Sequence, residues 1–583
     1  MAGGSKRSAE KLHQAKSSAE GRRGQAGHPA EGAGRSAPVV DRVLILVVTT
    51  LTVALLAISR YAIGPTGELG WSWPLLLLCV LVAAVAGRAL LGERREDRQA
   101  EPSTRRATAV VWALLLAAAI LPNLRTLGMG FFADDFGLLR AAALLNTPLD
   151  VFQRLPLRIF YRPMSLLVWW LGLHLWGGAA LGYHLFSVAL HTGNTALVYL
   201  LARRYTKGVF SATMGALLFA LHPVHVEATS WPSAQPDLLC TGFVLLSMLC
   251  LERYLTATSS RQRSLALTAG LAAFLLAVLS KETAAVLPGV VLVRLLVIPD
   301  QKRWGRALTL TGAYALTAAA YLGLRFAVLG PHWLGGYGVD VGGSQAGLSP
   351  APLLLLGELL FPLHITLINA VLSPYLWLLA VVLAGAALIW FMRNLVFVSW
   401  SHLALYAAYL LVPTIPIAMA GLMVGEEMAN SRYAYLPSVG LAFLFGEICA
   451  RRGRRPARSR AACLAIVCAA AVLSFWYVEP WRGAARFRDH LLAEGVRIVN
   501  SLPESPPPSM VYITGIPFAY LGAPVFVEGC YAAALSPLVN IAVEDVAPTP
   551  ARLGVMGETK LLPGQYVANW DQETQRLVIT RAG

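Results

Sequence analysis

Long apolar runs, separated by short polar segments, recur along most of this chain. Two of them, Val110 to Ile120 and Ala461 to Tyr477, contain no charged residue, and several runs are long enough to cross the hydrocarbon core of a bilayer. Such segments must be helical, because lipid offers no hydrogen-bond partners to open backbone groups. The pattern therefore predicts an all-α protein that spans a membrane many times.

The composition agrees with a membrane protein and excludes several other classes. Hydrophobic side chains make up 56% of the 583 residues and charged ones only 14%, which is too apolar for ordinary soluble domains. The net charge of +16 does not indicate a nucleic-acid partner, because the basic residues form short clusters between the apolar runs. The seven cysteines are scattered singly and predict neither a disulfide framework nor a Cys-x-x-Cys metal pair.

The basic clusters predict how the chain is threaded through the membrane. Short loops rich in Lys and Arg stay in the cytoplasm, and here they alternate with loops that are poor in cations. Starting inside, length and charge predict about thirteen crossings, and hence a C-terminus outside. The predicted crossings are 43–63, 72–91, 108–126, 181–202, 209–222, 236–256, 264–280, 283–299, 307–329, 373–392, 396–419, 434–450 and 460–478. Two further apolar stretches, 163–176 and 352–368, would break this alternation, and we expect them to lie along or re-enter the outer interface.

The segments on either side differ from this membrane part, which covers 43–480. Residues 1–42 are basic and rich in Gly, Ser and Ala, and are expected to form a disordered cytoplasmic tail. Residues 481–508 are expected to hold an amphipathic connecting helix and a Pro-rich linker, and 509–583 a small extracytoplasmic domain that is β-rich or α+β. Its predicted strands are 510–514, 525–527, 565–569 and 576–580, with a hairpin turn at 571–574.

Residues capable of chemistry gather on the predicted outer face. The first large outer loop, 127–162, begins with a Phe-Phe-Ala-Asp-Asp-Phe segment that contains Asp134 and Asp135, and it ends at Arg162. An acidic pair at an apolar boundary suits a general base, or a site for a divalent cation such as Mg²⁺ or Mn²⁺. The alternative is a structural role, in which the pair caps the following helix.

Later outer loops add imidazoles, carboxylates and cations. His222, His225 and Glu227 share one short turn, which suits a proton relay, a metal site, or hydrogen bonds to hydroxyl groups or phosphate. Cations at a membrane edge either extend toward the interface or bind a lipid phosphate. The remaining candidates at this edge are Lys281, Glu282, Arg325, Arg432 and Tyr433.

Five short motifs follow one another in a recognisable order between about residues 108 and 440. They are Asp134-Asp135-Phe136, Tyr161-Arg162-Pro163, His222-Pro223-Val224-His225-Val226-Glu227-Ala228, Ser280-Lys281-Glu282 and Arg432-Tyr433-Ala434-Tyr435-Leu436-Pro437-Ser438. Together they resemble the GT-C glycosyltransferases, most closely the O-mannosyltransferase-like group that includes the animal transmembrane and tetratricopeptide-repeat proteins and bacterial relatives. The chain departs from that group in two ways: no tetratricopeptide repeats follow, and two extra helices precede the helix that leads into the Asp-Asp loop.

This resemblance implies an enzyme that moves a sugar from a polyprenyl-phosphate carrier to an acceptor hydroxyl outside the cytoplasm, with inversion. Asp134 or Asp135 would be the catalytic base. The residues expected to bind the substrates or the lipid phosphate are Arg162, His222, His225, Glu227, Lys281, Glu282, Arg325, Arg432 and Tyr433. The sugar, the need for a metal, and the choice between a glycan, lipid or protein acceptor stay open. High Ala, Leu and Arg content favours a bacterial plasma membrane.

Two other functions stay open. Polar groups within a helical bundle also mark the substrate path of a transporter or lipid flippase, although here they gather at one face and no inverted repeat is visible. The second alternative is a non-catalytic scaffold whose outer tail binds a partner. Transport without glycosyl transfer would favour the first alternative, and cellular function without either aspartate would favour the second.

Overall fold

A computed structural model describes residues 103–582 of the chain, with gaps. The gaps are 153–159, 207, 298–303, 331–349, 372–373, 420–426, 451–455, 504–506, 518, 522, 527–529, 540, 547–560 and 562. The predicted cytoplasmic tail and the predicted crossings 43–63 and 72–91 lie outside the described residues. All described residues belong to one compact unit, 48–583.

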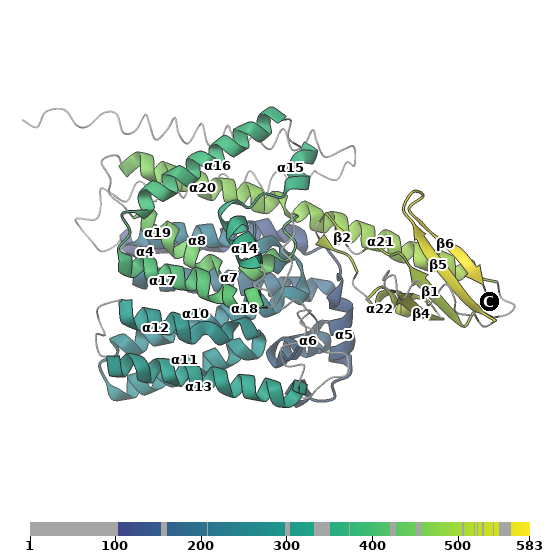
Figure 1. Ribbon diagram of the computed structural model, residues 1–583, viewed down its shortest axis with the longest axis horizontal. Coiled ribbons are helices and arrows are strands. Elements are labelled where there is room, and N and C mark those ends of the chain that lie inside the picture. Colours follow the sequence, from purple (N-terminus) through teal and green to yellow (C-terminus); the bar gives the residue numbers. More distant parts are fainter. Residues whose placement is uncertain are drawn as a thin grey trace, which may run out of the picture. The chain divides into compact units, whose positions relative to one another are not determined.

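Most of the described chain forms a bundle of helices (Figure 1). The α-helices of the bundle are α4 (Ser103–Ile120), α5 (Asp134–Ala143), α6 (Pro163–Trp176), α7 (Ala180–Tyr205), α8 (Val209–Leu221), α9 (His225–Ser230), α10 (Gln235–Thr256), α11 (Ser260–Ser280), α12 (Leu287–Val297), α13 (Trp304–Leu329), α14 (Ala351–Leu360), α15 (Ile365–Val371), α16 (Pro374–Leu395), α17 (Trp400–Leu411), α18 (Ile415–Met419), α19 (Ser438–Cys449) and α20 (Pro456–Trp476). Short 3₁₀ turns join several of them: η3 (Leu121–Thr126), η4 (Pro148–Phe152), η5 (Pro232–Ala234), η6 (Glu282–Val286), η9 (Val412–Thr414) and η10 (Ser431–Ala434).

The predicted crossings from 108–126 onward all fall on these helices, because each apolar run must satisfy its backbone internally. The two apolar stretches left out of the count are also helical: 163–176 is α6, and 352–368 is divided between α14 and α15. Among the described residues, seven helical stretches are long and apolar enough to cross a bilayer. The all-α, multi-pass prediction is therefore confirmed, whereas the count of about thirteen crossings stays a prediction.

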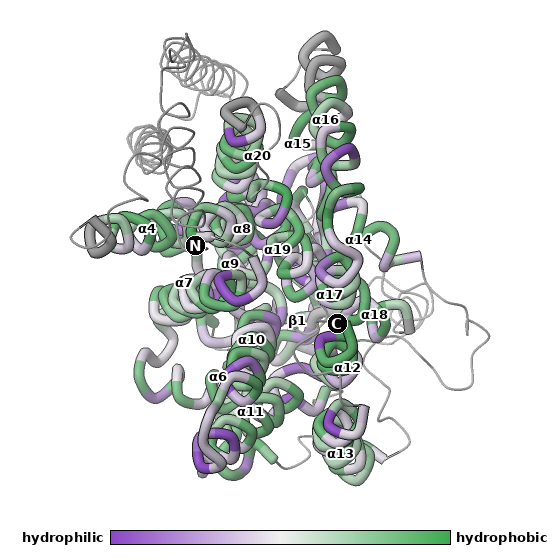
Figure 2. The backbone as a smooth tube through the Cα atoms, turned by 90° about the vertical axis from the view of Figure 1, so that its left-hand side faces the viewer, coloured by the Kyte–Doolittle hydropathy of each residue, from purple (hydrophilic) through white to green (hydrophobic). Residues whose placement is uncertain are grey.

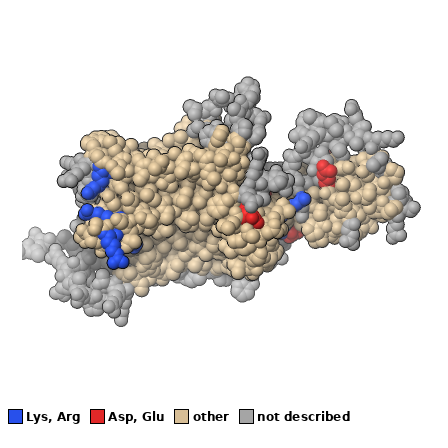
Figure 3. All heavy atoms as spheres, turned by 90° about the horizontal axis from the view of Figure 1, so that it is seen from below, with Lys and Arg blue, Asp and Glu red and all other residues tan. Residues whose placement is uncertain are grey.

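The surface of the bundle suits a lipid environment. Hydrophobic residues cover the helices along most of their length (Figure 2), and Leu308 and Leu316 on α13 are 63% and 72% exposed. On the face drawn in Figure 3, most of the visible Lys and Arg gather at one end of the bundle, and the visible acidic residues, with a smaller basic patch beside them, lie away from that end. The coloured surface between these two regions shows no charged residue of either sign. A charge-free band of this kind is expected where the protein faces hydrocarbon.

Small residues let the central helices approach closely. A Cβ atom on Gly215 of α8 would lie 2.5 Å from the carbonyl oxygen of Ala442 on α19, and one on Gly446 of α19 would lie 2.6 Å from that of Ser211 on α8. Membrane helices pack mainly through such backbone contacts, because lipid supplies no hydrophobic drive for their association. These two glycines therefore fix α8 against α19 at the centre of the bundle.

A long helix connects the bundle to the C-terminal region. α21 (Val478–Asn500) follows α20 after a single intervening residue, and its amphipathic pattern buries Trp481, Arg488 and Leu491. Figure 1 shows α21 extending away from the bundle and alongside the strands. The predicted connecting helix is confirmed, with its start at 478 instead of 481.

The C-terminal region is a small α+β unit with strands in the order β4-β1-β5-β6. β1 (Met510–Thr514) is parallel to β4 (Ala542–Val546) and to β5 (Gln565–Asp571), and β5 forms an antiparallel hairpin with β6 (Arg576–Ala582). The remaining elements are β2 (Ala519–Tyr520), β3 (Ala523–Pro524), α22 (Cys530–Leu535) and η11 (Ser536–Leu538).

Three of the four predicted strands, and the hairpin turn, are confirmed. Asp571 accepts hydrogen bonds from the Glu573 amide (3.0 Å) and the Thr574 hydroxyl (2.7 Å), which closes the turn. The predicted strand 525–527 is wrong for Val525 and Phe526, which follow β3 without joining a ladder, and residue 527 lies outside the described residues. β4 was not predicted, because its adjacent Glu and Asp obscure the apolar alternation.

Two of the cysteines predicted to stand alone are paired. Cys449 at the end of α19 and Cys463 on α20 form a disulfide, and their Cα atoms lie 6.1 Å apart. Their separation of fourteen residues is not a local motif. The pair arises from the packing of α19 against α20, which the spacing of the cysteines does not reveal.

Candidate functional site

A tight turn at 132–135 presents the two adjacent aspartates at the start of α5. The Asp135 amide donates to the Phe132 carbonyl oxygen (2.8 Å), and the Phe132 amide donates back to the Asp135 carboxylate (2.8 Å). Between them Ala133 has φ 40° and ψ −114°, a conformation that favours glycine. The chain therefore accepts backbone strain at this turn to place the two carboxylates.

Asp135 is fully buried and holds α5 against the turn that precedes α10. Its carboxylate accepts a hydrogen bond from the Ser233 amide (2.8 Å) and another from the Ser233 hydroxyl. Burial raises the pKa of Asp135 to about 8, although the hydrogen bonds from Ser233 and Phe132 lower it. A buried carboxylate with these hydrogen bonds anchors the 132–135 turn to the segment before α10.

Asp134, in contrast, is exposed. Burial lowers the pKa of Arg432, but nearby negative charges, that of Glu227 first, raise it by more. Asp134 contributes to that rise, so its carboxylate is close enough to Arg432 to interact with it electrostatically. Of the two sequence-predicted carboxylates, only Asp134 is therefore open to a substrate.

Glu282 joins two arginines that lie far apart in the sequence. It accepts a bidentate pair of hydrogen bonds from Arg162, at 3.0 and 2.6 Å, and Arg325 lies 3.6 Å away. Burial raises the pKa of Glu282, but Arg162 and then Arg325 lower it further, to about 2. Bidentate pairing fixes the planes of both groups, so this unit is charged and rigid.

A second ion pair lies beside the ring of Tyr433. Lys281 donates to Asp237 at 2.5 Å and places its ammonium 4.1 Å from the centre of the Tyr433 ring. Lys281 is only 1% exposed, so its charge is held by these two contacts and not by water.

Arg432 also lies beside the Tyr433 ring. Its guanidinium stands 4.9 Å from the Tyr433 ring centre and 4.7 Å from that of Trp231, and it forms an ion pair with Glu227. Glu227 also accepts hydrogen bonds from the Arg432 amide (2.9 Å) and from the Ser431 hydroxyl (3.1 Å). The Tyr433 ring thus contacts two cations, each with a carboxylate of its own.

The two predicted histidines point into the protein. The His222 Nε2 atom lies 3.0 Å from the Leu359 carbonyl oxygen, and the His225 Nε2 atom lies 2.8 Å from the Ser438 hydroxyl. Burial, with smaller effects from neighbouring imidazoles, lowers the pKa of His225 well below its usual value, so the ring is neutral. The structure brings Glu227 of this motif to the cation cluster and keeps both imidazoles away from solvent.

Two residues of this area were not among the site residues predicted from the sequence. Ser233 carried no signal, because a lone serine in a turn is common. Glu358 is the single acid of the apolar helix α14, which packs on η10, and its Oε2 atom is buried without a hydrogen-bond partner among the described residues. An isolated acid in an apolar stretch is itself a functional signal, and it would have identified this residue.

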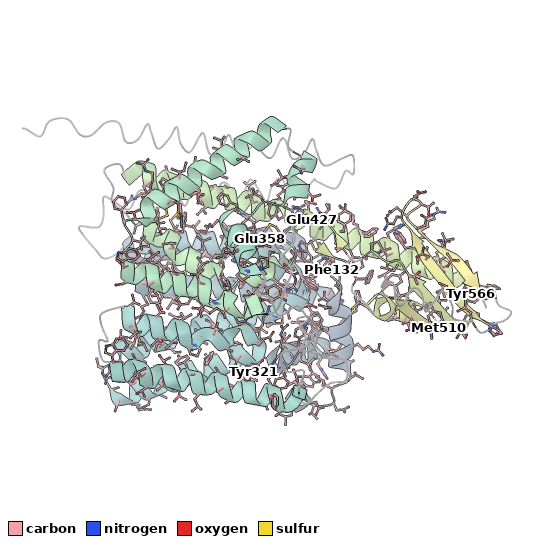
Figure 4. The ribbon with its side chains drawn as sticks, in the orientation of Figure 1. Phe132, Tyr321, Glu358, Glu427, Met510 and Tyr566 are labelled. Atoms are coloured by element: carbon pink, nitrogen blue, oxygen red, sulfur yellow. A yellow bond between two sulfur atoms is a disulfide. The ribbon has the colours of Figure 1, made fainter. Side chains whose placement is uncertain are left out.

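All five sequence motifs therefore meet at one place in the bundle. Phe132 marks the turn beside the start of α21, and Tyr321 on α13 contacts the Tyr161 backbone through its hydroxyl at 3.2 Å (Figure 4). Around Tyr433 four cations face three carboxylates, so the cluster carries one surplus positive charge beside Asp134. The paired side chains are Arg162, Arg325 and Glu282, then Lys281 and Asp237, then Arg432 and Glu227. The described residues contain no group of three or more His, Cys, Asp and Glu that suits a metal ion.

Comparison with known proteins gives matches over part of this region. The family described as dolichyl-phosphate-mannose-protein mannosyltransferase matches residues 161–328. The chain is 29% identical over 157 residues to the protein O-mannosyl-transferase F38B6.6 of Caenorhabditis elegans, covering 23% of this chain and 22% of that protein. It is 34% identical over 186 residues to Tmtc1 of Drosophila melanogaster, covering 29% and 20%. The chain thus spans about a fifth of the length of these relatives.

Solved structures with lower identity also align. ArnT of Cupriavidus metallidurans in the apo state is 18% identical with a TM-score of 0.42, covering 80% of this chain and 94% of that one. The oligosaccharyltransferase AglB of Archaeoglobus fulgidus is 12% identical with a TM-score of 0.41, covering 78% and 65%. Through its matched segment and its curated relatives, the chain is similar to the protein O-mannosyltransferases.

Proposed function

We propose that this protein is a membrane glycosyltransferase that moves a sugar from a polyprenyl-phosphate carrier to an acceptor hydroxyl on the extracytoplasmic side. The observation that carries the proposal is the placement of Asp134. It is an exposed carboxylate in the 132–135 turn, and it interacts electrostatically with Arg432, which belongs to a cluster with one surplus positive charge. A base beside a cation cluster is what transfer from a lipid phosphate requires.

In the proposed reaction, Asp134 removes the proton of the acceptor hydroxyl. The freed oxygen attacks the anomeric carbon, and the bond from that carbon to the phosphate oxygen breaks on the opposite face, with inversion. The phosphate leaves with the bonding electron pair, and Lys281 and Arg432 stabilise its negative charge.

Arg162 and Arg325 have a supporting role in this proposal. Both are bound to Glu282, which keeps their guanidinium groups in fixed positions at the edge of the cluster. Preorganised charges stabilise a leaving group without the cost of reorganising during the reaction. His222, His225 and Asp135 support the site from inside the protein and do not touch the substrates.

Mannose and protein hydroxyls are the first substrates to test, because the curated relatives are named protein O-mannosyl-transferases. The matched segment contains Arg162, Glu227, Lys281 and Arg325, so the comparison bears on the cation cluster. Asp134 and Arg432 lie outside the matched residues, and their roles rest on the geometry of this chain.

The direct test is transfer by the purified protein in lipid vesicles. The donor is polyprenyl-phosphate mannose with a radiolabelled sugar, and the acceptor is a set of Ser- and Thr-containing peptides. We expect Asp134→Asn to lower the transfer rate by about a hundredfold to ten-thousandfold, the range for losing a general base. Glu573→Gln removes an equivalent exposed carboxylate from the β5-β6 hairpin and is expected to have no effect.

Two outcomes would contradict the proposal. Full transfer activity in the Asp134→Asn variant would mean that another group is the base. Movement of the labelled lipid across the bilayer, with no transfer to any peptide, glycan or lipid acceptor, would identify a flippase. Repeating the assay with polyprenyl-phosphate glucose and arabinose then identifies the sugar.

A further inference from the structure

The turn that presents Asp134 is covered on one side by the C-terminal part of the chain. The Ala133 amide donates to the Val525 carbonyl oxygen at 2.9 Å, and the Phe136 ring stacks on Phe526 with 5.8 Å between ring centres. These two partners lie about 390 residues further along the sequence. The residues on both sides of Asp134 thus contact the same short segment.

Arg488 of α21 holds the residues just before the turn. It donates to the Phe131 carbonyl oxygen at 2.7 Å, and its guanidinium lies 5.3 Å from the centre of the Phe132 ring. The approach requires Gly130, where a Cβ atom would lie 2.7 Å from the Arg488 Nη1 atom. Arg488 is 7% exposed, so this guanidinium is committed to protein contacts.

These contacts come from one packed assembly. Phe526 packs edge-on against Tyr531 of α22, with 5.0 Å between ring centres, and the Tyr531 hydroxyl donates to the Leu491 carbonyl oxygen of α21 at 2.7 Å. α22 also packs directly on α5, and Figure 1 shows α5 at the edge of the bundle nearest to α22. Val525 and Phe526 are therefore fixed to α21 and α22, and are not part of an independent loop.

The turn needs such support because it is strained. Ala133 lies at a positive φ of 40°, which residues with a Cβ atom rarely adopt and which persists only when surrounding contacts hold it. The contact with Val525 is made by the amide of Ala133 itself. If that contact were lost, the turn would be free to relax, and the direction of Asp134 would change with it.

We infer that Arg488, Val525 and Phe526, which we call the clamp, hold the 132–135 turn so that Asp134 faces the cation cluster. Arg488 and Phe526 are positioning residues: they act through the turn and touch neither the sugar nor the phosphate. The C-terminal region is thereby a required part of the active site. This inference rests on the proposed function, because it assigns the clamp a role in the same reaction.

Two variants from different elements test the clamp. Phe526→Ala removes the ring that stacks on Phe136, and Arg488→Lys replaces the planar donor with a single ammonium group. For each we expect kcat to fall about a hundredfold, as for a base displaced by about 1 Å, with KM for the lipid-linked sugar changed less than about twofold. KM is preserved because the cation cluster is untouched. Val578→Ala, an exposed position on β6, is the matched control.

A second measurement does not depend on activity. Amide hydrogen exchange of the segment 130–137 is expected to become at least about tenfold faster in both clamp variants, because the turn opens more often. Adding Ala133→Gly to Phe526→Ala is expected to restore at least about tenfold of the lost kcat, since glycine adopts the required conformation without strain. A purely destabilising effect of Phe526→Ala would not be rescued by that change.

The outcomes separate the two proposals. If the unaltered protein transfers sugar and both clamp variants keep its kcat, or if exchange at 130–137 stays unchanged, the clamp is refuted and the proposed function stands. A rise in KM without a fall in kcat also refutes the clamp. If the unaltered protein transfers no sugar under any donor, the proposed function fails, and the clamp's role in the reaction fails with it, even where exchange rises.

Discussion

Replacing Asp135 with alanine should loosen the turn that carries Asp134, although Asp135 takes no part in the proposed chemistry. Its carboxylate accepts hydrogen bonds from the amides of Phe132 and Ser233 as well as from the Ser233 hydroxyl. Alanine leaves both amides without a partner in a buried place, at about 1–3 kcal/mol each. The expected cost is about 2–6 kcal/mol, or at least about a 30-fold rise in the population of the open turn.

Hydrogen exchange measured by mass spectrometry on the protein in nanodiscs reports this opening at residues 130–145. Asp135→Asn should cost less than Asp135→Ala, because its amide oxygen keeps one acceptor, either for Ser233 or for Phe132. It should still lose protection, because its NH2 group cannot accept from the other backbone amide. Asp134→Ala, at an exposed position, should change stability by less than about 0.5 kcal/mol.

Comparing Asp135→Ala with Asp134→Ala tests whether the two adjacent carboxylates have different roles. Equal protection of the turn in Asp135→Ala and in the unaltered protein would refute the anchoring role of Asp135. Loss of protection in Asp134→Ala, equal to that in Asp135→Ala, would show that the two carboxylates share one structural role, and the division between anchor and base would then be wrong.

Three further predictions follow from the site. Glu282→Gln leaves two buried guanidinium groups without their carboxylate, so we expect a loss of about 3–5 kcal/mol and a lower midpoint of thermal unfolding; an unchanged midpoint would argue against the ion pair. The folded-state pKa of Asp135 is raised, so the protection of the turn against hydrogen exchange should be greatest near pH 4 and weaken as the pH rises toward 8. This pH dependence should vanish in Asp135→Asn. The same pH profile in both proteins would contradict the prediction. Leu149→Cys, at a position 73% exposed in the predicted first outer loop, should react with a membrane-impermeant thiol reagent added outside intact cells, whereas Arg261→Cys, in a predicted cytoplasmic loop, should not. The reverse labelling would invert the predicted topology and remove the proposed site from the outer face.

The helices of the bundle could be predicted because lipid leaves an apolar run no other backbone solution. Every predicted crossing within the described residues is helical, and β1, β5 and β6 lie where β-branched and aromatic residues indicated strands. The Cys449–Cys463 pair and the position of Val525 were missed, because both depend on how separate elements pack. Local sequence does not contain that information.

At the candidate site, too, the local sequence predicts some features, and others depend on how separate elements pack. The five motifs identified which residues gather, but Asp134 and Asp135 are chemically identical and adjacent, so no pattern separates a base from an anchor. Ser233 makes the distinction, and it lies about a hundred residues away in sequence. Likewise the sequence could not tell that His222 and His225 are directed into the protein while Glu227 of the same motif reaches Arg432.

The pairing of each cation with a carboxylate has a consequence for what the site admits. Headgroups of ordinary anionic phospholipids crowd the same membrane surface at far higher concentration than any polyprenyl carrier. A bare cluster of four positive charges would hold them indiscriminately, but here most of that attraction is already neutralised by Glu227, Asp237 and Glu282. A lipid must therefore gain additional contacts through its sugar or its tail, so that bulk phospholipid competes poorly for the site beside Tyr433.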